Sequence, residues 1–185
     1  MNEMLKLIAD RRTCRSYTGE LPPEELLQAV AVAGIQSPSA VNRQLWQVIV
    51  LRDKAFIDEI EADCLRIVKE MEDQSMYERI MSRGGKPWYN TPCVIFVAAD
   101  PASKYMALDC GILTQSMALA AHSVGLGSCI NAMCRVAFDG VNGKSYKERL
   151  GFNPGYELGL ALLVGYPAAP PLLREFDLTK ISYVG

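Results

Sequence analysis

Three arginines close to the start of the chain have the chemistry of a ligand-binding site. The run RRTCRSY at residues 11–17 carries guanidinium groups at Arg11, Arg12 and Arg15, and a hydroxyl at Thr13. A guanidinium group offers planar, permanently charged donors that match phosphate oxygens and the carbonyl edges of heterocycles. The cluster therefore predicts an anionic or polar planar ligand, and the alternative interpretation is a solvated basic face.

A second run, PSAVNRQLW at residues 38–46, combines small side chains with amides. Such residues offer several hydrogen bonds with little bulk, so this run could form a loop that covers a ligand. The candidate binding residues in it are Pro38, Ser39, Ala40, Asn42 and Gln44.

A third run, GLGSCINAM at residues 125–133, follows a predicted helix and leads into a short predicted strand. The dinucleotide-binding fingerprint GxGxxG stands directly after a strand, so this run does not predict a Rossmann pocket. A nicotinamide dinucleotide is therefore expected only as a transient co-substrate.

Together the three runs resemble the FMN-dependent nitroreductase family, whose N-terminal pattern is close to RRSxRx[FY] followed by PSxxNxQPW. Leu45 stands where that family usually has proline. The resemblance implies that the first run, Arg11, Arg12, Thr13 and Arg15, binds the phosphate, the ribityl chain and the pyrimidine edge of FMN. Within that run Arg15 is expected nearest the pyrimidine edge.

The resemblance also implies contacts from two later parts of the chain. The third run would lie along the flavin ring, with contacts at Ile130, Asn131, Ala132 and Met133. Near the C-terminus the family often supplies a Lys-x-Arg pair to the phosphate. Only Arg174 is available for that role here, and a surface arginine is the alternative.

The implied assembly is a homodimer with FMN at the subunit interface, in which loop 38–42 of the second subunit covers the flavin. The implied reaction is ping-pong hydride transfer from NAD(P)H to a nitroaromatic, a quinone or a similar small-molecule acceptor, with no obligatory acid or base. One alternative is a specialised enzyme of the same family: a dehalogenase, an azoline-type dehydrogenase or a flavin-destroying enzyme. Another is a flavin-binding or regulatory protein with little turnover.

The composition limits the other classes of function. The 185 residues suit a single domain spanning 1–185, and a net charge of −2 predicts no nucleic-acid partner. Six cysteines and one histidine lack the spacing of a zinc site. They are expected as free, buried thiols of a cytoplasmic protein, with Cys14 as a less favoured reactive candidate. The sequence shows no signal peptide and no apolar run that could span a membrane.

The hydrophobic periodicity predicts the elements that must position these runs. Helices are expected after Asn2, from Pro22 to a stop at Gly34, from residue 53 or 54 to about 68, at 105–124, and at 145–150. Strands are expected at residues 47–51, 93–99, 128–131 and 156–164. These elements alternate too irregularly for a βαβ array, so the predicted class is α+β. The family resemblance adds a mostly antiparallel or mixed sheet flanked by helices.

Two segments stand apart from this pattern. Residues 69–88 are polar, rich in methionine and end in a Gly-Gly-Lys-Pro sequence, which predicts a mobile excursion. Residues 180–184 (KISYV) form a strand candidate with no obvious partner in its own subunit. This strand is expected to complete the sheet of a second subunit.

Overall fold

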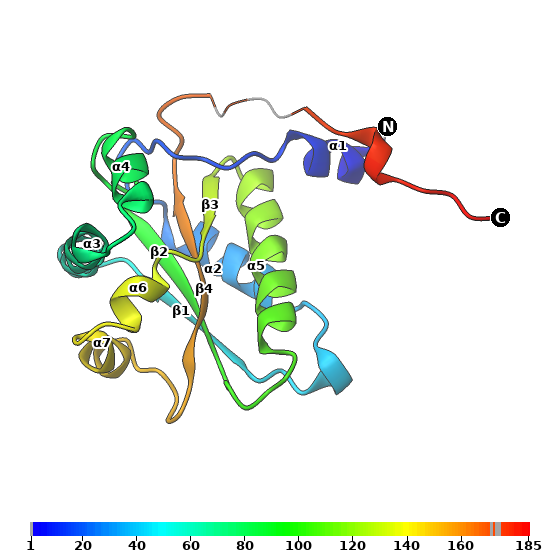
Figure 1. Ribbon diagram of the computed structural model, residues 1–185. Coiled ribbons are helices and arrows are strands. Elements are labelled where there is room, and N and C mark those ends of the chain that lie inside the picture. The colour runs from blue at the N-terminus through cyan, green and yellow to red at the C-terminus, as the bar shows by residue number, and fades with distance from the viewer. Residues whose placement is uncertain (1, 171, 173–174) are drawn as a thin grey trace.

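The computed structural model describes residues 2–170, 172 and 175–185. Its centre is a four-stranded antiparallel sheet with the strand order β1-β2-β4-β3 (Figure 1). The strands are β1 (Trp46–Leu51), β2 (Cys93–Ala99), β3 (Gly127–Asn131) and β4 (Glu157–Gly165). The predictions of an α+β class and of these four strands are confirmed.

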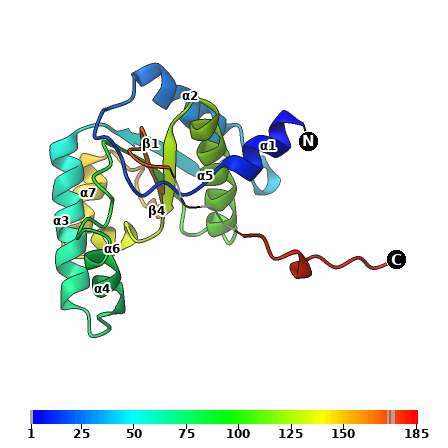
Figure 2. The ribbon, with the colours of Figure 1, turned by 90° about the horizontal axis from the view of Figure 1, so that it is seen from above.

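Helices cover both faces of the sheet, as the view in Figure 2 shows. One face carries α2 (Glu24–Ile35) and α5 (Met106–Ser123). The other carries α3 (Lys54–Glu70), α4 (Ser75–Met81), α6 (Arg135–Phe138) and α7 (Gly143–Arg149). Helix α1 (Glu3–Asp10) lies outside these layers, and η1 (Ala40–Asn42) and η2 (Leu178–Lys180) are single 3₁₀ turns.

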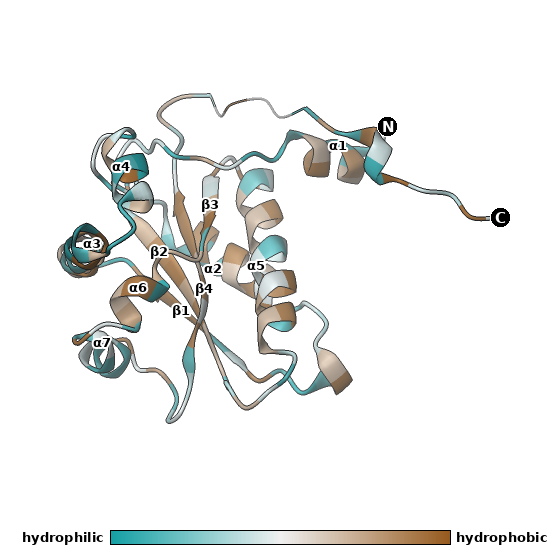
Figure 3. Cartoon of the chain, in the orientation of Figure 1, coloured by the Kyte–Doolittle hydropathy of each residue, from teal (hydrophilic) through white to brown (hydrophobic). Residues whose placement is uncertain are grey.

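Strand β2 shows how the sequence builds two cores from one sheet. All seven of its residues are buried, so the strand reads as a continuous apolar run. Cys93, Ile95 and Val97 pack with α2 and α5, whereas Val94 and Phe96 pack with the helices of the opposite face. Hydrophobic residues accordingly concentrate in the strands in Figure 3. Within the described residues, no helix combines the length and the apolar character needed to span a membrane.

The expected helix stop at Gly34 is wrong, because α2 continues through this residue to Ile35. Gly34 has a packing role instead. A Cβ placed on it would lie 2.6 Å from Cγ of Met117, so only glycine allows α2 and α5 to approach this closely.

Residues 69–88 differ from the expected mobile excursion, since they contain α4 and end on Trp88, which is fully buried. Oε1 of Glu61, a buried residue of α3, accepts a 2.7 Å hydrogen bond from the Trp88 backbone N–H. Lys86 pairs with the same carboxylate at 3.6 Å. Burial raises the pKa of Glu61, and these two partners oppose that rise. Helix α4 is too short for its periodicity to stand out in the sequence.

The expected strand at residues 180–184 does not form within the described chain. Beyond η2 the C-terminal residues extend away from the body of the molecule without pairing to any strand (Figures 1 and 2). A strand needs a neighbouring edge, and this segment does not reach one in its own chain.

The anchor between α3 and Trp88 should be measurable. Glu61→Ala is expected to lower the free energy of unfolding by about 1–3 kcal/mol, because the buried Trp88 N–H loses its acceptor. Glu61→Gln keeps an oxygen acceptor and should lower it less. Urea unfolding followed by circular dichroism measures both. The matched control is Glu59→Ala on the same helix, which removes an exposed pair with Arg149. Equal losses in Glu61→Ala and Glu59→Ala would contradict the anchor.

Candidate functional site

The arginine run is fixed against the outer edge of β3. Thr13 forms a parallel bridge with Ser128, and the Cys14 N–H donates to the Ser128 carbonyl at 2.8 Å. Three residues after Cys14, the buried Tyr17 hydroxyl donates to the Leu163 carbonyl of β4 at 3.2 Å. These bonds set the register of the run, so each arginine has a defined position along the sheet edge.

This close contact depends on a glycine in β3. A Cβ at Gly127 would lie 2.7 Å from Sγ and 2.8 Å from Cβ of Cys14, so any larger residue would displace the arginine run. The same burial raises the pKa of the Cys14 thiol. Cys14 is therefore a packing residue, and its interpretation as a reactive thiol is wrong. All six cysteines are free and buried, as expected.

The run lines two adjoining cavities, which we call the arginine pocket. The larger has a volume of about 480 Å³ and the smaller about 200 Å³. Arg11 and Arg12 line both, while Thr13 and Arg15 line the larger. The larger cavity is also lined by residues of α1, α5 and the C-terminal segment: Ile8, Gln115, Leu172 and Phe176. The smaller cavity is also lined by Cys14 of the run, by the end of α5 and the turn into β3, and by the residue two positions after β4: His122, Gly125, Leu126, Gly127, Ser128 and Pro167.

Two polar atoms in the arginine pocket are buried without a partner within the described residues. They are Nε of Arg12 and Oγ of Ser128, and both residues line the smaller cavity. Nη1 of Arg12 donates to the backbone carbonyl of Arg11 at 2.8 Å and to that of Ala9, and the guanidinium stands over the Phe176 ring. A buried polar atom without a partner is costly, so the pocket suits a polar ligand.

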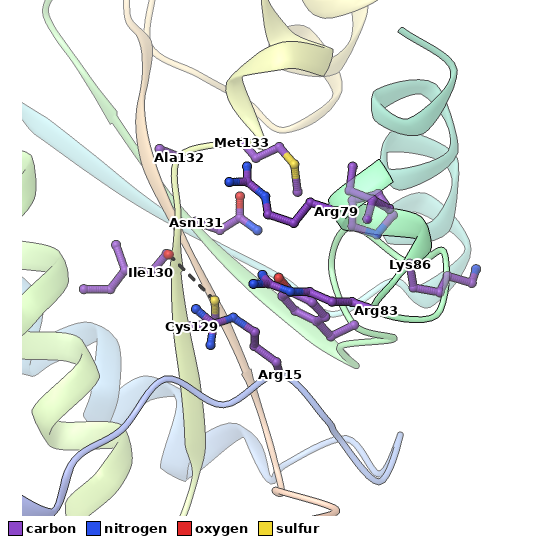
Figure 4. Close-up of a pocket in the computed structure, with 12 residues that line it drawn as sticks. Arg15, Arg79, Arg83, Lys86, Cys129, Ile130, Asn131, Ala132 and Met133 are labelled. Atoms are coloured by element: carbon purple, nitrogen blue, oxygen red, sulfur yellow. Dashed lines mark hydrogen bonds between the residues drawn. The ribbon is translucent and has the colours of Figure 1, made fainter. Parts of the chain in front are cut away.

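Beside the arginine pocket, where β3 ends, lies a cavity of about 310 Å³ that we call the strand-end pocket (Figure 4). Arg15 lines both pockets and so joins them. The strand-end pocket brings together Ile130, Asn131, Ala132 and Met133 with residues of α4 and the loop after it: Arg79, Ile80, Arg83, Lys86, Pro87 and Tyr89.

The four residues from the end of β3 play different local roles. Ile130 is partly exposed on the strand, and Ala132 is exposed after it. Oδ1 of Asn131 accepts a 3.0 Å hydrogen bond from the Cys134 N–H, which fixes the turn into α6. Met133 packs against the core at its side of the cavity. The structure thus places these residues in one wall, next to Arg15.

The loop containing Pro38, Ser39, Ala40, Asn42 and Gln44 lies elsewhere in the chain. The Ala40 N–H donates to Oδ1 of Asp109 in the first turn of α5, whereas the arginine pocket is lined by Gln115 from the middle of that helix and by His122 from its last turn. Inside the loop, the Gln44 N–H donates to Ser39 Oγ at 2.9 Å. Within one chain this loop does not reach either pocket. Arg174 lies outside the described residues.

Sequence reasoning missed the contribution of α4 to the strand-end pocket. Arg79 and Arg83 are four residues apart and face the same cavity, a spacing typical of one helix face. That spacing was the available signal in residues 69–88. It was hidden because α4 ends at Met81, before the second arginine.

Residues 8–166 match the model of the nitroreductase family. A nitroreductase from Desulfitobacterium hafniense, solved with bound FMN, is 45% identical over the full length of both chains with a TM-score of 0.96. A putative NADH dehydrogenase/NAD(P)H nitroreductase from Methanothermobacter thermautotrophicus is 28% identical over 97% of this chain and 85% of that protein.

A more distant relative carries a different activity in its name. The iodotyrosine deiodinase of Thermotoga neapolitana is 23% identical over 92% of this chain and 91% of that protein. The family match spans most of the chain and includes both pockets, apart from the C-terminal residues that close the arginine pocket. The chain therefore belongs to the nitroreductase family.

Proposed function

We propose that this protein is an FMN-dependent oxidoreductase. The observation that carries the proposal is a pair of neighbouring pockets that share Arg15: the arginine pocket, and the strand-end pocket with its wall of residues 130–133. FMN has the matching form, with a phosphate at one end and a planar ring at the other. The 45% identical relative solved with bound FMN supports the same assignment.

The donors in the arginine pocket fit the phosphate end of FMN. Arg11, Arg12 and Thr13 would hold the phosphate and the ribityl chain through charge-assisted hydrogen bonds. The unpartnered Nε of Arg12 and Oγ of Ser128 support a polar ligand at this place. Arg174 remains a candidate for an additional phosphate contact.

The strand-end pocket fits the ring. Residues 130–133 would lie along it, largely through their backbone, while Arg15 would face the pyrimidine edge. A cation at that edge stabilises the negative charge of a reduced flavin and so raises its reduction potential. When bound, FMN supplies the redox chemistry, taking a hydride from NAD(P)H and passing it to a nitroaromatic, quinone or similar acceptor in a ping-pong cycle.

We further propose that the active unit is a homodimer with FMN at the interface. Helix α1 exposes Met4, Leu5 and Ile8, although its periodicity is that of a packed helix. Val41 in loop 38–44 is 90% exposed and adopts a left-handed φ of 55°. A β-branched residue seldom adopts that conformation without external support. A second subunit would cover these surfaces and bring its own loop over the flavin.

The C-terminal segment supports the same assembly. Its apolar side chains are largely exposed, including Leu178, Ile181 and Val184. Within the described residues, the outer edge of β1 carries no strand. An open edge accepts a further strand through main-chain hydrogen bonds. We propose that residues 180–184 of one subunit pair with the sheet of the other.

Two alternatives remain distinguishable from this proposal. The deiodinase relative favours a specialised enzyme such as a dehalogenase, with an azoline-type dehydrogenase or a flavin-destroying enzyme as further members of that class. A flavin-binding or regulatory protein would bind FMN with little turnover. Steady-state oxidation of NAD(P)H with a nitroaromatic acceptor separates the enzyme from the binder.

The buried free thiols are consistent with the further proposal of a cytoplasmic location.

Arg11→Ala and Arg15→Ala should have different effects. Arg11→Ala should weaken FMN binding by about 1.5–3 kcal/mol, the usual cost of losing a hydrogen bond to a charged group. Arg15→Ala should in addition lower the flavin reduction potential, because the reduced ring loses its cation. Fluorescence titration with FMN and spectroelectrochemistry measure the two effects. Arg52→Ala, in a surface pair with Glu24, is the matched control. Unchanged affinity and potential in both variants would overturn these assignments.

Deletion of the residues after Asp177 should weaken both the dimer and FMN retention. The deletion removes the main-chain hydrogen bonds proposed to join the two subunits and uncovers the interface. Sedimentation velocity with and without FMN compares the truncated chain with the full-length protein. A full-length monomer that keeps FMN bound would contradict the interface model, even though the family assignment would stand.

A further inference from the structure

The strand-end pocket contains two arginines that the proposed flavin contacts do not use. Arg79 comes from the last turn of α4 and Arg83 from the turn that follows, and both line the cavity opposite the end of β3. In Figure 4 the side chains of Arg79 and Arg83 reach toward the end of β3, whereas Lys86 extends away from them. They line the same cavity as residues 130–133, along which we propose that the flavin ring lies.

The charges of Arg79 and Arg83 are not balanced by carboxylates. Within the part of the chain that the structure describes, neither forms an ion pair, although other exposed arginines do, as Arg149 does with Glu59. Lys86 forms an ion pair with Glu61. With Arg15, three guanidinium groups line the same cavity, and no acidic residue of the described chain lines it.

The backbone holds the two arginines in place. The N–H groups of Arg83 and Gly85 both donate to the Ile80 carbonyl at 3.0 Å, and Gly85 takes a left-handed φ of 72°. This is the usual closed turn at the end of a helix. Three residues later the buried Trp88 anchors the loop to the core. The convergence of charges is thus built into the fold of this segment.

Like charges that share a partly enclosed cavity repel, and a bound anion relieves that repulsion. We propose that the preferred acceptor is a small aromatic or quinonoid molecule that carries an anionic group, such as a carboxylate, bound by Arg79 and Arg83. Its reducible part then lies over the flavin. This inference rests on the proposed function and adds the substrate class.

A nitrobenzoate tests the proposal, with the neutral 4-nitrobenzamide as its isostere. Reduction of the nitro group to a nitroso group consumes one hydride and one proton and releases one water molecule. The hydride comes from NAD(P)H through the proposed flavin, and the proton comes from solvent. The ratio of kcat/KM for 4-nitrobenzoate to that for 4-nitrobenzamide measures anion preference, and comparing this ratio between variants cancels the intrinsic reactivity of the acceptors.

The FMN-loaded wild type is expected to prefer the benzoate. Arg79→Gln and Arg83→Gln should each lower the ratio about tenfold, mainly through the KM of the benzoate, as the loss of a charge-assisted hydrogen bond predicts. Arg83→Lys should retain part of the preference because it keeps the charge. Arg52→Gln, at the opposite edge of the sheet from β3, should leave the ratio unchanged.

A binding readout accompanies the kinetics. Titration with benzoate and with benzamide, followed through the flavin absorbance spectrum, should show weaker benzoate binding in both glutamine variants and unchanged benzamide binding. The flavin reduction potential should stay at the wild-type value in these variants. A potential lowered as in Arg15→Ala would show that the arginines act on the flavin, and it would overturn the proposal.

The remaining outcomes distinguish a failure of the acceptor proposal from a failure of the proposed function. If the variants reduce both acceptors with the wild-type ratio, the acceptor proposal is wrong while the proposed function stands. If they raise the KM of NADPH and leave the ratio unchanged, the arginines bind the phosphates of the donor and the proposal is likewise wrong. If the wild type takes up no FMN, the proposed function itself fails.

Discussion

The contact between residues 13–17 and the outer edge of β3 is the constraint on which the rest of the site depends. It needs the bridge from Thr13 to Ser128 and the absence of a side chain at Gly127. Through it, the sheet core determines where each arginine lies. Cys14 and Tyr17 face the core, which leaves Arg15 exposed between them at the junction of the two pockets. A loop with the same residues but without this pairing would not fix the positions of the arginines along the sheet edge.

The arginines of this chain differ in whether a carboxylate balances their charge. Away from the pockets, Arg66 and Arg149 pair with carboxylates of α3. Around the strand-end pocket, Arg79 and Arg83 do not, within the described residues. The surface pairs contribute little to stability, since solvent screens them. Unpaired cations in a cavity matter more, because they set which ligand binds there. The same fold thus carries a basic pocket on a slightly acidic chain.

Elements with strong local signals were predictable from the sequence. The continuous apolar run of β2 and the long amphipathic pattern of α3 specify their structure almost residue by residue. The arginine run predicts an anionic or polar planar ligand, and that prediction stays open to test. The contribution of α4 was not predictable, because one buried residue, Ile80, gives no period. Tertiary contact decided two further points: Gly34 lies within α2 and packs against α5, and residues 180–184 reach no strand edge in their own chain.

The proposed function depends on how the flavin lies across the two pockets, and a crystal structure of the protein with FMN would show this orientation. The account predicts the phosphate in the arginine pocket, the ring in the strand-end pocket against residues 130–133, and loop 38–44 of a second subunit over the ring. It also predicts Arg15 at the pyrimidine edge. A phosphate held in the strand-end pocket by Arg79 and Arg83, or a flavin bound away from β3, would contradict the account.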